Sequence, residues 1–207
     1  MGTALQTART RLQGLPATFT YSQARKDAHL TDRHMAVLRE QGLIDAISRG
    51  LYRRVDKALS GDHGPLDIDL LEIAHRAPAA TLCLTTALAR HDLTDAIPAT
   101  IDVALPRGRH RPAVNVPVSW HSFDQSTYAI GREHLRLDNH TTIGIYSAER
   151  CIIDAFRLSH LEGEDLPIEA LRRWLRRRGN IPSTLLTMAQ AFPKAQRSLR
   201  YALRILL

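Results

Sequence analysis

The segment from Phe19 to Arg54 constrains the fold most, because it places two short helix signals and a basic hairpin signal in close succession. Apolar residues recur at helical spacing from Phe19 onward. Thr20 or Ser22 can cap the free backbone N–H groups at the start of a helix. The pattern predicts a first short helix from about Ser22 to Ala28.

A second helix signal follows directly. Thr31 can act as its N-cap, and Asp32 stands in the first turn, where the helix dipole favours a carboxylate. The helix is expected to run to about Gln41, with Gly42 as the left-handed residue that ends it. Residues 43–54 then read as two short strands about a turn at Ser48 to Gly50. This order of elements predicts a winged helix-turn-helix, a unit that most often binds DNA.

Candidate DNA contacts follow from which side of the second helix faces inward. Placing Met35 and Leu38 in the core leaves Asp32 and Arg33 on the opposite side, and Arg33 is the best candidate for a base contact. His34 and Arg39 lie on the flanks of this side and can reach bases or phosphates. The remaining basic side chains are assigned to phosphates, and they are Arg25, Lys26, Arg49, Arg53 and Arg54. Two alternatives stay open, since winged-helix units also dock proteins and short basic helices are often only solvated faces.

The distribution of charge divides the chain into three blocks. Residues 1–60 carry a net charge of +5, residues 61–171 of −7 and residues 172–207 of +9, the last with no acidic residue. A phosphate surface would attract both ends and repel the middle, which favours two separate contact zones over one continuous DNA channel. The acidic middle is also a surface on which a basic protein partner could dock.

The C-terminal block predicts a second basic surface on two helices. Its members are Arg172, Arg173, Arg176, Arg177, Lys194, Arg197, Arg200 and Arg204, spaced to fall on common helix faces. The alternative is a pair of amphipathic helices whose arginines simply face water.

Two domains are expected, residues 1–60 and residues 61–207, joined by a linker at Val55 to Pro65. The fold class is α+β, with a mixed α/β C-terminal domain that ends in helices. Periodicity predicts its helices at about 66–78, 82–93, 147–158, 167–178, 182–191 and 193–207, and its strands at 100–105, 114–123 and 142–145. The basic loop at 107–111 is expected to be a solvated hairpin connection.

The remaining composition points to an intracellular globular chain. Cys83 and Cys151 lack metal-ligand spacing and are expected to be buried thiols, with no metal and no cofactor. Neither an apolar run long enough to span a bilayer nor a secretion signal is apparent, so a cytoplasmic protein without membrane partners is expected.

The order of motifs resembles the AbiEi family of antitoxins from type IV toxin–antitoxin systems, in particular its mycobacterial members. The resemblance rests on Gly42-Leu-Ile-x5-Gly-Leu-Tyr-Arg53, on residues 84–93 followed by Pro98 and the 101–108 segment, and on residues 145–157. It implies that the N-terminal domain represses its own operon by binding promoter DNA at repeated half-sites. It also implies that the C-terminal domain counteracts a cognate nucleotidyltransferase toxin, by direct contact or indirectly.

The sequence leaves two other classes of function to consider. One is a winged-helix transcription factor whose C-terminal domain senses a small molecule, although no cofactor motif is recognisable. The other is an enzyme built around Ser119, His121 and Asp124. No nucleophile elbow, phosphate-binding glycine loop or zinc-protease spacing accompanies these residues, so the chain is not expected to be an enzyme.

Overall fold

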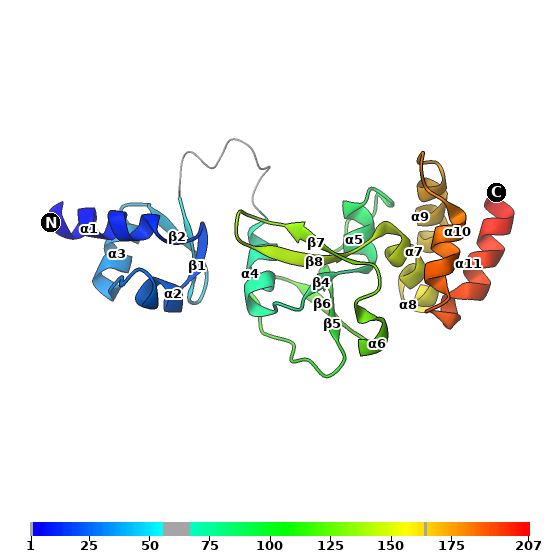
Figure 1. The fold of residues 1–207 in the computed structure, drawn as a ribbon, viewed down its shortest axis with the longest axis horizontal. Coiled ribbons are helices and arrows are strands. Elements are labelled where there is room, and N and C mark those ends of the chain that lie inside the picture. The colour runs from blue at the N-terminus through cyan, green and yellow to red at the C-terminus, as the bar shows by residue number, and fades with distance from the viewer. Residues whose placement is uncertain (1, 56–66, 164) are drawn as a thin grey trace. The chain divides into compact units, whose positions relative to one another are not determined.

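The computed structural model describes residues 2–55, 67–163 and 165–207 and shows a mixed α+β chain (Figure 1). Two compact units are present. One comprises Met1–Pro78 with Ala113–Asn115 and Arg136–Ile143, and the other comprises Ala79–Pro112, Val116–Leu135 and Gly144–Leu207. The predicted linker, and the predicted boundary between residues 60 and 61, fall within 56–66 except for Val55, and so lie outside the described residues.

The first unit opens with three helices and a small antiparallel sheet. Its elements are α1 (Gly2–Gln13), β1 (Thr18–Thr20), α2 (Tyr21–Lys26), α3 (Asp32–Glu40), β2 (Ile44–Ser48) and β3 (Leu51–Arg54), and the strand order is β1-β3-β2. The two predicted helices and the predicted hairpin are therefore present. Phe19 belongs to β1, not to the start of a helix, because Thr20 caps α2 through a reciprocal pair of bonds with Gln23.

The core of these elements is built from apolar residues on every helix. Phe19 and Leu38 are completely buried, and the ring of Phe19 stacks on that of Tyr52 with 5.9 Å between centroids. Burial of side chains of this size stabilises the fold by about 1.5–3 kcal/mol each. Gly42 has a φ of +62°, as expected for the residue that ends α3. Helix α1 was not predicted, although Ala8 and Leu12 carry its buried face.

Among the described residues, three helices and a five-stranded sheet follow. Their elements are α4 (Ile68–Arg76), β4 (Thr81–Leu82), α5 (Leu84–Arg90), β5 (Ile101–Pro106), β6 (Val118–Phe123), α6 (Gln125–Tyr128), β7 (Arg132–Arg136) and β8 (Thr142–Tyr146). The strand order is β6-β5-β4-β8-β7. β4 is antiparallel to β5 and parallel to β8, and β5 is parallel to β6.

Three predictions in this region are corrected. The helix expected over 82–93 is wrong at its start, because Leu82 ends the two-residue strand β4 and Cys83 separates it from α5. The strand expected from Val114 begins only at Val118. The loop at 107–111 does not close a hairpin, because the strands that it leaves and enters are parallel.

The chain closes with a layer of helices at its C-terminal end (Figure 1). These are α7 (Ala148–Arg157), α8 (Ser159–Glu162), α9 (Asp165–Leu175), α10 (Pro182–Ala189) and α11 (Pro193–Leu206). Ser147 caps α7 as predicted, and Pro182 and Pro193 open α10 and α11 in the first turn, where their missing N–H costs nothing. Helix α7 packs against α5, α9, α10 and α11, so it is the centre of this layer.

Arg150 of α7 is a completely buried charge with a full set of partners on one side. Its Nε donates to Asp154 Oδ2 at 2.9 Å, and its Nη1 donates to the carbonyls of Thr127 and Ile130, both at 2.7 Å. Arg157 forms a second ion pair with Asp154 at 2.9 Å. The guanidinium of Arg150 therefore ties α7 to the backbone that leads from α6 into β7.

Aromatic rings cover the faces of the same guanidinium. Its carbon lies 4.3 Å from the centroid of Tyr146 and 4.2 Å from that of Phe192, and Phe123 is 5.6 Å away. The Nη2 atom has no hydrogen-bond partner among the described residues, and the ring faces compensate part of that desolvation. Because Phe192 precedes α11, this stack couples the sheet to the C-terminal helix.

Gly144 permits the closest approach inside the sheet. A Cβ atom at this position would lie 2.5 Å from Thr81 Oγ1, 2.6 Å from an Arg132 nitrogen and 2.8 Å from the Ala80 carbonyl. The space is used by a hydrogen bond from Arg132 Nε to Thr81 Oγ1 of 2.7 Å. Glycine is therefore required by packing at this point of β8.

Candidate nucleic-acid interface

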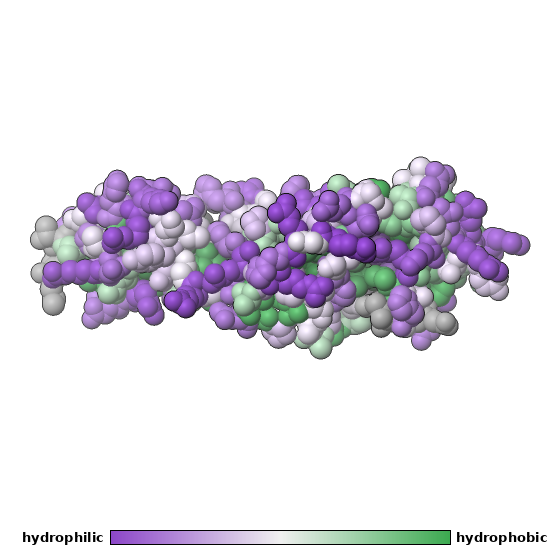
Figure 2. All heavy atoms as spheres, turned by 90° about the horizontal axis from the view of Figure 1, so that it is seen from below, coloured by the Kyte–Doolittle hydropathy of each residue, from purple (hydrophilic) through white to green (hydrophobic). Residues whose placement is uncertain are grey.

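The face of α3 that points away from the core is the best-formed candidate for a binding surface. Met35 and Leu38 are buried, whereas Arg33, Ala36 and Arg39 are exposed on the same helix. In the view of Figure 2, hydrophilic side chains cover most of the surface over the N-terminal elements. An exposed arginine in the first turns of a well-supported helix can reach a base edge in a major groove.

The start of α3 is held rigidly. Thr31 Oγ1 accepts from the backbone N–H of His34, and His34 Nδ1 accepts from the backbone N–H of Thr31, each at 3.3 Å. The hydroxyl of Tyr21 on α2 donates to Asp32, and this hydrogen bond raises the pKa of Tyr21. These bonds fix the first turn of α3 relative to α2, which is the part of the helix that carries Arg33.

Two of the candidate contacts on α3 thus have roles within the fold. One ring nitrogen of His34 takes part in the capping box, and Asp32 accepts a hydrogen bond from the hydroxyl of Tyr21. A carboxylate also repels phosphate, so Asp32 is better explained as a first-turn residue that holds α3 to α2 through Tyr21 than as a DNA contact. The exposed basic members of the set are Arg25, Lys26, Arg33, Arg39 and Arg49.

The two arginines of β3 are less available than the sequence suggests. Arg53 pairs with Asp45 of β2 at 3.0 Å. Arg54 is half-buried, and its Nη1 donates to the Leu15 carbonyl at 2.9 Å. These bonds hold the hairpin and the end of the α1 segment in place, so the basic side chain that the hairpin offers to solvent is Arg49 at its turn.

Helix α1, which the sequence pattern did not predict, supports α3. It packs against α3, and Arg11 donates to the His29 carbonyl in the turn before α3 at 2.7 Å. The spacing of Ala8, Leu12 and Leu15 is helical, and it is the signal that could have revealed this helix.

The second basic surface is divided by internal bonds. Arg173 pairs with Glu169 at 2.6 Å and with Asp95 through Nη1 at 2.8 Å, and Arg177 donates to the carbonyls of His91 and Asp92. These two arginines fasten the end of α9 to the segment after α5. Arg173 is partly buried, and the exposed members are Arg172, Arg176, Arg177, Lys194, Arg197, Arg200 and Arg204.

The residues considered for an enzyme each bond to a different partner. His121 Nε2 lies 3.0 Å from Asp102 Oδ1, Ser119 bonds to the Thr100 hydroxyl at 2.6 Å, and Asp124 caps α6. Within the described ranges no cluster of three or more histidine, cysteine or acidic side chains is arranged to hold a metal ion. Cys83 and Cys151 are both buried, as predicted. No helix in the described part of the chain has the length and apolar character needed to cross a membrane.

Together these features define a mixed α+β chain: helices around a three-stranded sheet, with two arginines exposed on α3, and a second group of helices around a five-stranded sheet. No protein-family model matches the chain, and no curated protein matches it. Among solved structures, it is similar to the RV2827C protein from Mycobacterium tuberculosis, with a TM-score of 0.59 and 17% sequence identity over 97% of this chain and 74% of that one. At this identity the similarity supports the mixed α+β fold and nothing beyond it.

Proposed function

We propose that the N-terminal elements form a winged helix-turn-helix that binds operator DNA, with α3 as the recognition helix and the β2–β3 hairpin as the wing. The observation that carries the proposal is the exposed face of α3, where Arg33 projects from a capped and clamped first turn while Met35 and Leu38 anchor the helix. In such a unit the recognition helix reads bases and the wing holds phosphates.

The exposed basic residues divide into two roles in this proposal. Arg33 reads a base edge, with Arg39 on its flank. Arg25, Lys26 and Arg49 hold phosphates, which sets affinity and salt dependence but not sequence choice. A single unit of this size buries too little surface for tight specific binding, so repeated half-sites in the operator are expected.

The binding test uses a duplex from the chain's own promoter and a scrambled duplex, measured by fluorescence anisotropy. Arg33→Ala should weaken specific binding by about 1–3 kcal/mol, roughly 5- to 150-fold, and should leave non-specific binding nearly unchanged. Arg49→Ala should weaken binding to both duplexes alike. It should also reduce the slope of log binding constant against log salt concentration by about 1. Arg178→Ala, an exposed arginine of the second unit, is the matched control. Equal binding of both duplexes by the unaltered chain would contradict sequence recognition.

We further propose, on the resemblance to the AbiEi family, that the chain is an antitoxin that represses its own operon and counteracts a nucleotidyltransferase toxin. The test is co-expression of an adjacent-gene toxin with the full chain, with residues 1–60 and with residues 61–207, scoring growth. Rescue by residues 61–207 supports a separable antitoxin domain. No rescue by any folded form would leave a DNA-binding repressor alone.

A further inference from the structure

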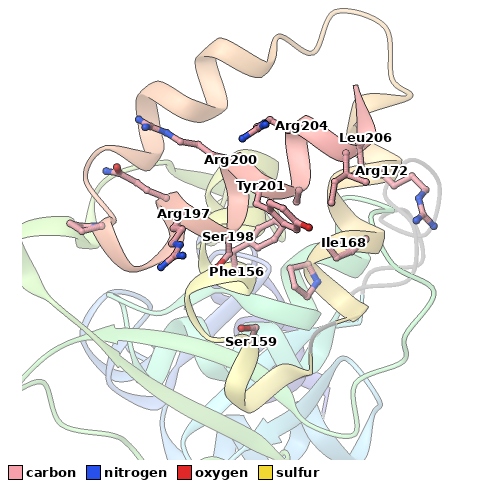
Figure 3. A pocket seen from close by; sticks show the side chains of 15 residues that line it. Phe156, Ser159, Ile168, Arg172, Arg197, Ser198, Arg200, Tyr201, Arg204 and Leu206 are labelled. Carbon is pink, nitrogen blue, oxygen red and sulfur yellow. The ribbon is translucent and has the colours of Figure 1, made fainter.

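A groove of about 970 Å³ lies along α11, between that helix and the segment of α8 and α9 (Figure 3). Its apolar wall is formed by Phe156, Ile168, Tyr201 and Ile205. The close-up shows Tyr201 directed toward Ile168 across the groove. All of these residues belong to the second unit, so the groove is complete within one compact part of the chain.

Helix α11 has more apolar surface than its packing requires. Leu199 and Leu203 are buried and attach the helix to the layer below it. Tyr201 and Ile205, four residues apart, form a second apolar strip, and they remain 66% and 64% exposed. Large apolar side chains grouped on a surface in this way mark an interaction site more often than an isolated exposed residue does.

The charged side chains among the described residues at the rim of the groove are all arginines. Arg172 comes from α9, and Arg197, Arg200 and Arg204 come from α11, while none of the described residues that line the groove is acidic. These four arginines are exposed, in contrast to Arg173, which is held by two carboxylates. The groove therefore combines an apolar strip with unneutralised positive charge.

We propose that this groove binds an acidic amphipathic helix of a protein partner. Such a segment presents apolar residues three and four apart to the strip and carboxylates to the arginine rim. A helix about 10 Å wide that rises 5.4 Å per turn occupies about 420 Å³ per turn, so the groove accommodates about two turns. The groove shares no residue with α3, and the proposal stands or falls independently of DNA binding there.

A nucleic-acid strand fits the same charge less well. Single strands bind where several aromatic rings stack on successive bases. The exposed strip offers one ring, Tyr201, beside the aliphatic Ile205 and Ile168. An aliphatic wall is matched by apolar side chains, which favours a protein segment.

The experiment measures binding of the full chain to a fluorescein-labelled 14-residue helical peptide by fluorescence anisotropy. The peptide carries leucine at every third or fourth position and glutamate elsewhere, with an i,i+4 staple on its outer face. A scrambled peptide of the same composition and a 14-nucleotide single-stranded DNA are the comparison probes. Thermal unfolding of each variant confirms that it is folded, as expected for substitutions at exposed positions.

The proposal requires that Arg200→Glu/Arg204→Glu raise the dissociation constant of the peptide at least tenfold. Ile205→Gln, which leaves the charge unchanged, should raise it about threefold or more. The control Arg176→Glu/Arg178→Glu makes the same charge change outside the groove and should have little effect. The scrambled peptide should bind at least tenfold more weakly than the amphipathic one.

Three results would overturn the proposal. The first is an equal loss of peptide binding in the groove variant and in its charge-matched control, which would show general electrostatic attraction. The second is equal binding of the scrambled peptide. The third is a loss of single-stranded DNA binding in the groove variant without measurable peptide binding, which would assign the groove to nucleic acid.

Discussion

Replacement of Arg150 by methionine should be the most destabilising single change in the second unit. The substitution retains most of the apolar volume but removes the donor to the Thr127 and Ile130 carbonyls and one partner of Asp154. Loss of one partner from a buried ion pair costs about 3–5 kcal/mol, and each buried carbonyl left without a donor costs about 1–3 kcal/mol.

These contributions overlap, and Arg157 still pairs with Asp154 at 2.9 Å, so the net loss should be about 4–5 kcal/mol. The measurement is urea unfolding followed by the fluorescence of the buried Trp174, with Arg178→Met as an exposed control that should change stability by less than about 0.5 kcal/mol. Arg150→Lys retains a charge but cannot make the same three bonds. Its loss of stability should lie between those of Arg178→Met and Arg150→Met. A loss below about 1.5 kcal/mol for Arg150→Met, with an unchanged m-value, would refute the reasoning.

Four smaller predictions follow from local geometry. Gly144→Ala should destabilise the chain by about 2 kcal/mol or more in urea unfolding, because its Cβ meets the backbone and two side chains below 3 Å. Thr31→Ala removes the α3 cap and should cost about 1 kcal/mol in the same assay. The hydrogen bond from Arg173 lowers the pKa of Asp95, so this carboxylate stabilises the fold at neutral pH and loses that effect as the pH falls below about 4; Arg173→Gln should return the carboxyl's NMR titration toward its ordinary value. Burial raises the pKa of the Cys151 thiol well above its usual range, so Ellman's reagent should modify it only after unfolding.

The parts of the fold that local chemistry encodes were predictable. Thr31, Gly42 and Ser147 mark helix ends by bonds to residues within four positions, and all three do so in the structure. The mixed α+β class was likewise confirmed. Apolar periodicity marked α11, which buries one face. Helix α7 was placed by its Ser147 cap, and it is buried continuously from Arg150 to Phe156.

The missed elements depend on partners that are distant in sequence. β4 is only two residues long and exists because β5 and β8 pair with it, so no periodicity can reveal it. β7 is charged along much of its length and lies at the edge of the sheet. The sequence pattern also could not predict which arginines form bonds within the fold. Arg173 and Arg177 bond to a carboxylate and to carbonyls that follow α5, about 80 residues earlier in the sequence.

The shortness of β4 also constrains when the sheet can form. Thr81 pairs with Ala104 on one side and with Gly144 on the other, so the middle of the sheet joins three separate parts of the chain. Such non-local pairing loses the entropy of loop closure before its contacts stabilise the chain, and this slows folding. During synthesis the sheet cannot close until β8 has left the ribosome, and any truncation before Tyr146 would remove the strand that completes its centre.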